Sequence, residues 1–270
     1  MPTQMSNPSL IDLGFLIQED AAEYQAQSDV FLTADALHQF RRSPLGYFRR
    51  RLGRALECEP WRDGVGDAVR LQILQGREAF ERDYASRRKR SPGPLTRLFS
   101  KARATRAAPL LSEDNTRTVA QINSAVLRHT VARDLLAEGI AESVVRGELA
   151  GQPCQARLDW FNPDTQRGIV QLELVHDLNL FEFLVGHGGH AHKAAFSRAL
   201  VAVNCGCLFP VHIIAVERAE PFRAGVWEIA ASVLDATQRE NEETVREMER
   251  SHKAHTWPTG FEAMRTIDRI

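Results

Sequence analysis

Apolar and polar residues follow two different periods along this chain. Up to about residue 138, apolar positions recur at helical spacing, and Leu37 and Phe40 share one face of a first helix that Thr33 caps. Beyond Gly139 the period shortens to the alternation that is typical of strands, beginning at Glu142. The pattern therefore predicts helices first, followed by a mixture of strands and helices.

The helical part contains three predicted units. A Ser-Pro pair at 43–44 interrupts the first helix, which resumes and ends at Gly53. The second unit covers residues 66–84, where Gly76 marks a weak point. A long third helix is predicted over residues 112–138.

The second part of the chain predicts a sheet. Residues 168–175 are apolar at nearly every position, which indicates a strand that is buried on both faces. The order of elements predicts an α/β or α+β domain with a mixed central sheet flanked by helices. We expect an irregular arm over residues 1–30 and one domain over 31–270, with a helical part at 31–110 and the core at 111–270. The remaining predicted elements are strands at 142–148, 155–159, 211–217 and 226–229, and helices at 191–203 and 231–253.

The net charge of the 270-residue chain is −1, so binding to a polyanion needs a local basic patch. Residues 86–106 hold eight basic residues and no acidic one, and their composition predicts a loop. A second basic cluster lies near residue 50. Each cluster could neutralise DNA phosphates, and each is also what an ordinary solvated surface presents. The candidate DNA-binding residues are Arg87, Arg88, Lys89, Arg90, Arg49 and Arg50.

Several classes of protein have no support in the sequence. There is no apolar run of 18 residues and no Lys or Arg in the first 30 residues, so we expect neither a membrane partner nor a signal peptide. The four cysteines lack CxxC spacing, which favours reduced thiols and a cytoplasmic location. No P-loop, GxGxxG helix start or GxSxG motif occurs, so no nucleotide cofactor is predicted.

Two acidic residues, Glu142 and Asp159, stand at ends of predicted strands, and Glu142 taken alone is what an ordinary solvated acid presents. Asp159 has a structural alternative, because it could end its strand before a turn or pair with Arg157. The three histidines of the run HGGHAH, residues 187–192, allow a zinc interpretation, but their spacing and the absence of suitable cysteines do not favour it.

The order of several short segments resembles the PD-(D/E)XK nuclease superfamily, in particular its exodeoxyribonuclease VIII (RecE-like) branch. The likeness covers most of residues 30–268. It is carried by LTADALHQFRRSPLGYF, GDAVRLQILQGREAF, LLAEGIAESVV, GQPCQARLDWF, GGHAHKAAFSRAL and TWPTGFEAMRTIDR.

This resemblance implies a restriction-endonuclease-like core and a metal-dependent DNA exonuclease that uses Mg²⁺ or Mn²⁺. It also implies DNA as a partner, a role in recombination, repair or phage-related processing, and a possible homo-oligomer. Glu142 matches the glutamate at the helix-to-strand junction, and Asp159 matches the aspartate of the RxD piece.

The chain departs from the family pattern at four positions. The Asp-x-Lys of the family falls on Gln171 and Glu173, its helix glutamine on Lys193, and its early histidine on Arg70. Two hypotheses remain open. In one, the site has migrated: Asp159, Glu173 and Lys193 are catalytic, and Glu142, Asp159 and Glu173 bind the metal. In the other, catalysis is lost and the chain binds DNA or a protein partner.

The first hypothesis requires the Lys193 ammonium within about 5 Å of the acidic side chains. Strand side chains alternate, so Glu173 shares a face with Gln171 and stays in the site after a two-residue shift. Three further residues are candidates to line the site: Arg70, Gln171 and His190.

Overall fold

The computed structural model describes residues 13–53, 64–88, 111–264 and 266, with backbone alone at 85–88. Within these residues, no helix combines the length and the apolar character that crossing a membrane requires. The elements, in chain order, are β1 (Ile17–Gln18), α1 (Ala21–Ala26), α2 (Ala34–Arg42), α3 (Pro44–Arg51), α4 (Val65–Leu74), α5 (Gly76–Arg88), α6 (Glu113–Arg128), α7 (Thr130–Leu135), β2 (Ile140–Leu149), β3 (Gln152–Asn162), β4 (Gly168–Val175), η3 (Leu178–Leu180), α8 (Phe181–His187), α9 (His190–Cys205), β5 (Val211–Glu217), β6 (Ala224–Glu228) and α10 (Ala231–Ala254).

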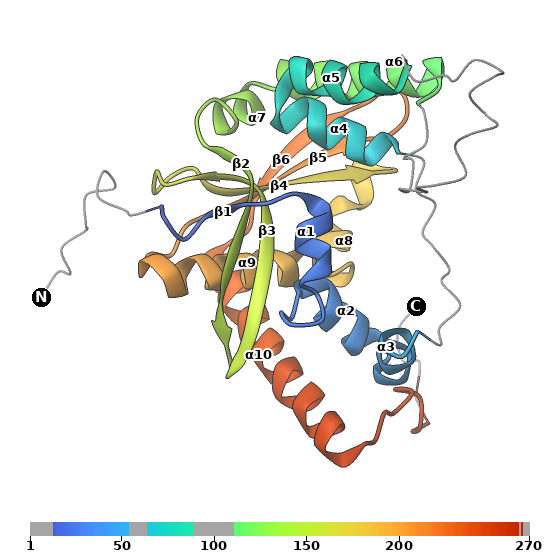
Figure 1. The fold of residues 1–270 in the computed structure, drawn as a ribbon, viewed down its shortest axis with the longest axis vertical. Coiled ribbons are helices and arrows are strands. Elements are labelled where there is room, and N and C mark those ends of the chain that lie inside the picture. Colours follow the sequence, from blue (N-terminus) through green and yellow to red (C-terminus); the bar gives the residue numbers. More distant parts are fainter. Residues whose placement is uncertain (1–12, 54–63, 89–110, 265, 267–270) are drawn as a thin grey trace, which may run out of the picture.

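A six-stranded mixed sheet runs through the centre of the molecule (Figure 1). Its strands follow the chain order β1-β2-β3-β4-β5-β6, and neighbours are antiparallel except for β4 and β5. Parallel neighbours need a crossover, which the chain makes through α8 and α9. The predicted fold class, a mixed central sheet flanked by helices, is confirmed.

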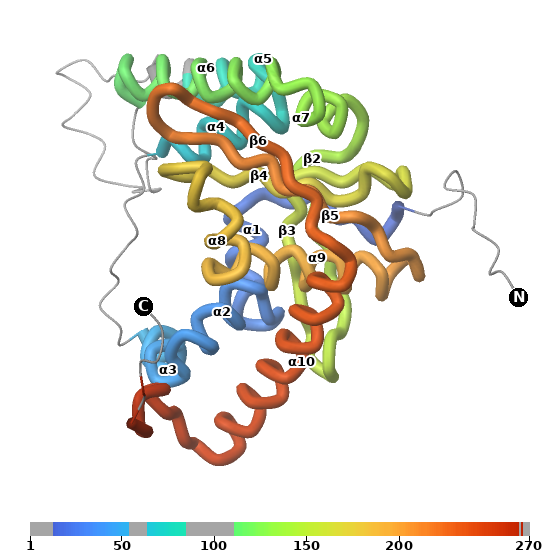
Figure 2. The backbone as a smooth tube through the Cα atoms, turned by 180° about the vertical axis from the view of Figure 1, so that it is seen from behind, coloured from blue at the N-terminus to red at the C-terminus, as the bar shows by residue number. Residues whose placement is uncertain are grey.

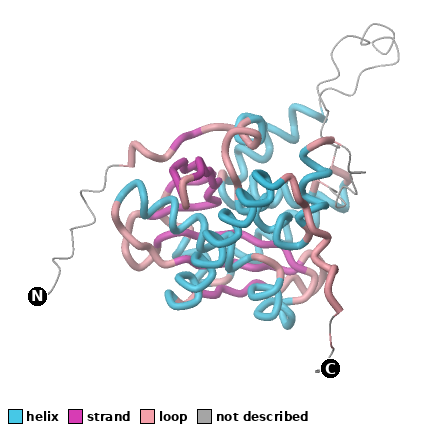
Figure 3. Tube along the Cα trace, turned by 90° about the horizontal axis from the view of Figure 1, so that it is seen from below, coloured by secondary structure: helices cyan, strands magenta, loops and turns pink. Residues whose placement is uncertain are grey.

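Helices cover both faces of the sheet. The helices α4 to α7 lie on one side, and α9, α10 and α2 lie on the other (Figures 1 and 2). Seen from below, the strands lie in the interior of the molecule with helices around them (Figure 3). Strand β4 sends Ile169 and Val175 into the core beside α9, and Val170 and Leu172 into the core beside α4 and α6. Its prediction as a doubly buried strand is therefore confirmed.

Local chemistry sets the helix boundaries. The predicted interruption at Ser43 is present, and its hydroxyl accepts a hydrogen bond from the Gly46 N–H that starts α3. Gly76, with φ of +87°, separates α4 from α5. The single long helix predicted over 112–138 is wrong, because the chain breaks at His129 into α6 and α7. The ring of His129 caps α7 by accepting from the Ala132 N–H at 3.3 Å.

The expectation of an irregular arm over residues 1–30 is wrong for its described part. Ile17 pairs antiparallel with Val144, so β1 extends the sheet. Asp20 and Glu23 then form a capping box at the start of α1. Two polar residues, three positions apart, thus begin a helix that apolar periodicity does not reveal. Residues 1–12 lie outside the described residues.

The predicted basic loop 86–106 is also shorter than expected at its start, because α5 continues to Arg88. Residues 89–106 lie outside the described residues.

Gly168, at the start of β4, has φ of +57°, and a Cβ there would collide with the carbonyl oxygen of Pro210. Gly151 is a matched control, since its φ is +78° but nothing lies within 4 Å of its Cβ position. Both alanine variants carry backbone strain, and Gly168→Ala adds a clash. We expect Gly151→Ala to lower the free energy of unfolding by about 1 kcal/mol and Gly168→Ala by about 2–4 kcal/mol, measured by denaturant titration. Equal losses would contradict this account.

Candidate active site

The site lies where β3 and β4 separate. Their regular pairing ends at Trp160 and Val170, and the next β3 residue toward the gap is Asp159. Its Oδ2 accepts a hydrogen bond from the Leu172 N–H at 2.8 Å, so a side chain replaces the missing ladder bond. Asp159 does not end its strand, as the structural alternative required, because β3 continues to Asn162.

A row of three site candidates crosses the sheet at this level. The β2–β3 ladder skips the pair Glu142–Asp159, although the pairs on either side of it are in register. Glu142 has φ of +50°, which interrupts regular strand geometry. Continuing the β3–β4 register places Gln171 on the other side of Asp159. The sheet order alone therefore brings these positions together.

Glu173 is bound by the first turn of α9. Lys193 Nζ donates to Glu173 Oε1 at 3.1 Å, and His190 Nδ1 lies 3.6 Å from the same oxygen. Burial would raise the pKa of the Glu173 carboxyl, but the charges of Lys193 and Arg70 outweigh it and hold this pKa well below its ordinary range. Burial would likewise lower the pKa of Lys193, and Glu173 and Asp159 raise it instead. Both groups are therefore charged at neutral pH.

The Lys193 ammonium thus lies within the distance that the migrated-site hypothesis sets for Glu173. Asp159 is also close enough to contribute to the pKa of Lys193. Strand β4 supplies Glu173, and helix α9, which follows β4 after η3 and α8, supplies Lys193.

Arg70 reaches the site from the opposite side of the sheet, on α4. Its guanidinium makes a short contact with Asp159 Oδ1 and donates to the Leu172 carbonyl oxygen at 2.5 Å. Burial would lower the pKa of Arg70, but Asp159, Glu173 and Glu142 raise it. Arg70 is among the residues predicted to line the site, but its pairing with Asp159 is not predicted from the sequence. The available signal is that Arg70 is a lone cation in an otherwise mostly apolar helix.

Glu142 has its own partners. Arg157 donates to Glu142 Oε1 at 2.9 Å, and Gln75 makes a short contact with the other oxygen. Arg157 thus pairs with Glu142 and not with Asp159, which corrects the structural alternative. Glu142 lines an open cavity of about 600 Å³ together with Glu19, Asp20 and Glu23 and five other residues.

Gln171 is buried, and its side-chain oxygen accepts no hydrogen bond from any described residue. A buried carbonyl oxygen without a donor is costly unless a cation or water satisfies it. The position that carries an acid in the resembled family therefore keeps an oxygen but not a negative charge.

The oxygen donors of the site are of the type that a hard cation prefers, but they do not form a prearranged cluster. Carboxylate and carbonyl oxygens are the ligands that Mg²⁺ and Mn²⁺ prefer, and Asp159 and Leu172 already bind one positive group together. Within the described parts of the chain, however, no three His, Cys, Asp or Glu side chains surround a common point as metal ligands would. A divalent ion fits here only if the cation that already uses these oxygens moves.

The remaining candidates lie elsewhere or outside the described residues. Arg49 and Arg50 are exposed on α3, and their side chains form no ion pair or hydrogen bond with other described residues. The side chains of Arg87 and Arg88, and all of Lys89 and Arg90, lie outside the described residues.

The histidines of the HGGHAH run do not converge on a zinc position. His190 contacts Glu173, His192 contacts Glu240 on α10 at 2.8 Å, and His187 stacks on Phe183.

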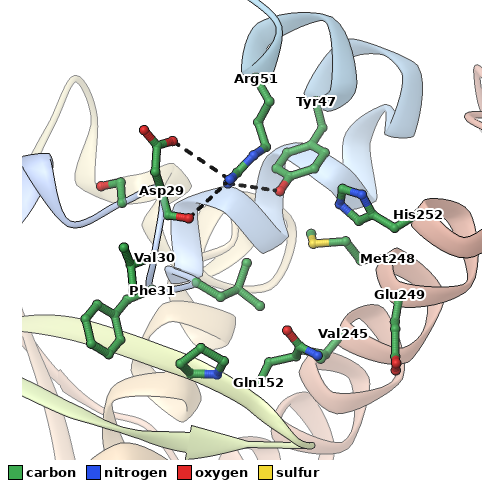
Figure 4. A pocket seen from close by; sticks show the side chains of 13 residues that line it. Asp29, Val30, Phe31, Tyr47, Arg51, Gln152, Val245, Met248, Glu249 and His252 are labelled. Carbon is green, nitrogen blue, oxygen red and sulfur yellow. Dashed lines mark hydrogen bonds and ion pairs between the residues drawn. The ribbon is translucent and has the colours of Figure 1, made fainter.

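A cavity of about 240 Å³ between α3, α10 and the β2–β3 turn contains none of the candidate catalytic or metal-binding residues (Figure 4). Arg51 crosses it to reach Asp29, beside the Tyr47 hydroxyl (Figure 4). It is lined by this separate ion pair and by both apolar and polar side chains of α10.

Comparisons with known proteins give the family and the fold of the chain. The family model of the PDDEXK-like domain of unknown function (DUF3799) matches residues 95–268. The chain therefore belongs to this family of PDDEXK-like domains. Its fold is similar to the crystal structure of a "putative exonuclease" from Eubacterium rectale, with a TM-score of 0.68, 13% identity, and coverage of 94% of this chain and 96% of that one. No curated protein matches the chain.

The fold and the family define a nuclease-like protein of the PD-(D/E)XK class, as the sequence resemblance implied. At 13% identity the structural likeness concerns the fold alone. The roles of individual residues remain predictions.

A double-mutant cycle tests the pair Glu173–Lys193. Lys193→Gln leaves a buried carboxylate without its nearest cation, and we expect it to lower the free energy of unfolding by about 1–3 kcal/mol, since the lysine is partly exposed. The double variant with Glu173→Gln should recover most of this loss. Because the folded pKa of Glu173 is lowered, its stabilisation is fully present above the unfolded pKa of about 4.3 and is lost progressively below it.

The measurement is denaturant unfolding of the wild type and the three variants between about pH 3 and pH 7, within the range where the carboxyl titrates. A coupling energy near zero, or a contribution of Glu173 that grows as the pH falls, would show that the two charges do not stabilise each other.

Proposed function

We propose that this protein is a DNA nuclease that hydrolyses phosphodiester bonds from DNA ends with the help of Mg²⁺ or Mn²⁺. The observation that carries the proposal is the proximity of three elements: Glu173 from β4 contacts Lys193 from α9 at 3.1 Å, and Asp159 from β3 is close enough to raise the pKa of Lys193. Membership of the PDDEXK-like family supports the same reaction class. The resemblance places such an activity in recombination, repair or phage-related DNA processing.

Asp159 and Glu173 are the side chains that would hold the divalent ion, with the Leu172 carbonyl oxygen beside them and Glu142 as the third acid. When bound, the ion supplies positive charge that neutralises the phosphate oxygens. The Leu172 N–H holds one oxygen of Asp159, so the other is presented toward a cation. The chain itself therefore fixes the orientation of its main acidic ligand.

Lys193 acts as a positive charge and not as a base. Its pKa is raised by Glu173 and Asp159, so the ammonium keeps its proton at neutral pH. A protonated lysine binds a phosphate oxygen and stabilises charge that develops on it. Glu173 positions this ammonium through their contact.

DNA binding is assigned to the exposed arginines Arg49 and Arg50 and to the basic residues Arg87, Arg88, Lys89 and Arg90. Contacts of this kind read the phosphate backbone and not the base sequence. We further propose a cytoplasmic protein, since Cys154, Cys205 and Cys207 are free thiols. A homo-oligomer also remains part of the proposal.

A second candidate is a nuclease-fold protein that binds DNA or a protein partner without cutting DNA. Two observations favour it: Gln171 carries no charge where the resembled family has an acid, and the guanidinium of Arg70 already binds Asp159. The two candidates differ in hydrolysis, so one assay separates them.

Purified protein is incubated with end-labelled linear DNA and with closed circular DNA, in Mg²⁺ or Mn²⁺. We expect loss of the linear DNA only, and we expect Asp159→Ala to slow it by at least about 100-fold, because the main acidic ligand is gone. Asp164→Ala, in the β3–β4 turn, is the matched control and should retain activity.

Cleavage that is unchanged in Asp159→Ala would reject this site. No cleavage by the wild type in either metal, with DNA binding retained, would reject the nuclease proposal and support the second candidate.

The double variant Arg49→Gln/Arg50→Gln tests the DNA contact. If each arginine neutralises one phosphate, the slope of log affinity against log salt should fall by about 2 for all DNA sequences, measured by fluorescence anisotropy. Arg246→Gln/Arg250→Gln is the matched control, since both arginines of α10 pair with Glu243. An equal fall of this slope in the control variant would contradict the assignment of the DNA contact to Arg49 and Arg50 on α3.

A further inference from the structure

The guanidinium of Arg70 fills the gap between β3 and β4. It contacts Asp159 Oδ1 and the Leu172 carbonyl oxygen, while the Leu172 N–H bonds the other oxygen of Asp159. The N–H and the C=O of Leu172 are thus both hydrogen-bonded by side chains, those of Asp159 and Arg70. One cation and one carboxylate replace the strand pairing that the separated backbones cannot make.

The charges of the site are balanced without any metal ion. Its three acids, Glu142, Asp159 and Glu173, are paired with Arg157, Arg70 and Lys193 respectively. A divalent ion that entered beside Arg70 would share oxygens with a cation of the same sign, which Coulomb repulsion disfavours in a partly buried site. An ion can take these oxygens favourably only when the guanidinium leaves them.

The Arg70 side chain is not fully buried. Its side chain is 27% exposed, so one edge already reaches solvent. Release requires a change of side-chain rotamers, whereas the strands and α9 can keep their places.

We infer that Arg70 occupies the cation position of this site, so that a divalent ion binds only by displacing its guanidinium from Asp159 and the Leu172 carbonyl. Arg70 is then the residue that sets the metal affinity of the proposed nuclease site. The inference rests on the proposed function, because it uses the same cation site. Arg70 competes with the divalent ion for the same oxygen atoms.

Binding of Mn²⁺ to the full chain, measured by the electron paramagnetic resonance signal of the free ion, tests the inference without any cleavage assay. We expect Arg70→Gln to bind Mn²⁺ at least tenfold more tightly than the wild type. Adding Asp159→Asn should abolish that gain, because the same carboxylate serves both cations. Arg146→Gln is the matched control, since Arg146 pairs with Glu19 at 2.6 Å in a similarly buried bridge, and it should bind Mn²⁺ like the wild type.

Equal Mn²⁺ affinity of the wild type and Arg70→Gln overturns the inference, and so does a gain that persists with Asp159→Asn. Circular dichroism confirms that each variant is folded. If Arg70→Gln fails to fold, Arg70→Lys replaces it: a lysine cannot bridge both oxygens as the guanidinium does, so Mn²⁺ should bind at least threefold more tightly. Unchanged or weaker binding by Arg70→Lys then overturns the inference.

The result is separable from the nuclease proposal. Tighter Mn²⁺ binding by Arg70→Gln without DNA cleavage by any variant keeps this inference and rejects the nuclease activity. DNA cleavage by the wild type, together with equal Mn²⁺ affinities of the wild type and Arg70→Gln, keeps the nuclease proposal and rejects this inference.

Discussion

The structure of this site depends on the carboxylate of Asp159 in the gap between two strands. Where the β3–β4 ladder ends, one of its oxygens takes the N–H of Leu172 and the other takes the guanidinium of Arg70. Without these bonds, backbone groups at the centre of the sheet would lose their partners, at a cost of about 1–3 kcal/mol each. The residue that the proposed chemistry needs most is therefore also a structural element of the sheet.

The other charges follow from that arrangement. Glu173 points to the α9 side of β4 and meets Lys193, while Arg70 comes from the α4 side. The ammonium is thus delivered from a helix and not from the strand that carries the acid. Relative to the resembled family pattern, the cation has moved from the strand to the helix, and the acid has moved two residues along the same strand to Glu173. An acid and a cation are therefore both present although the motif is not.

Much of the fold could be predicted from periodicity. The limits of β4 at Gly168 and Val175, its burial on both faces and the break at Gly76 follow from local sequence alone. The split at His129 and the ordering of α1 could not be predicted in this way, because they depend on single caps by a ring nitrogen and by Asp20. Such caps leave no periodic signal in the sequence.

The site shows the same division. The contact between Glu173 and Lys193 could be anticipated, since the crossover that joins β4 to β5 includes α9 and returns to the same sheet. The partners Arg70 and Arg157 could not be identified, because pairing between Arg70 and Asp159 depends on how α4 packs against the sheet, 89 residues away in sequence. Which of several basic residues pairs with a distant carboxylate is decided by the packing of helices against the sheet, and composition does not reveal it.

The central claim is that the oxygens of Asp159 and Leu172 form a position for one cation, which Arg70 holds and a divalent ion can take. A crystal structure grown with Mn²⁺, with its anomalous difference map, tests this most directly. The account predicts a manganese peak between the Asp159 carboxylate and the Leu172 carbonyl oxygen, with the Arg70 side chain turned away. A map without manganese at this position under saturating Mn²⁺, or a peak there with Arg70 still bound to Asp159, would contradict it.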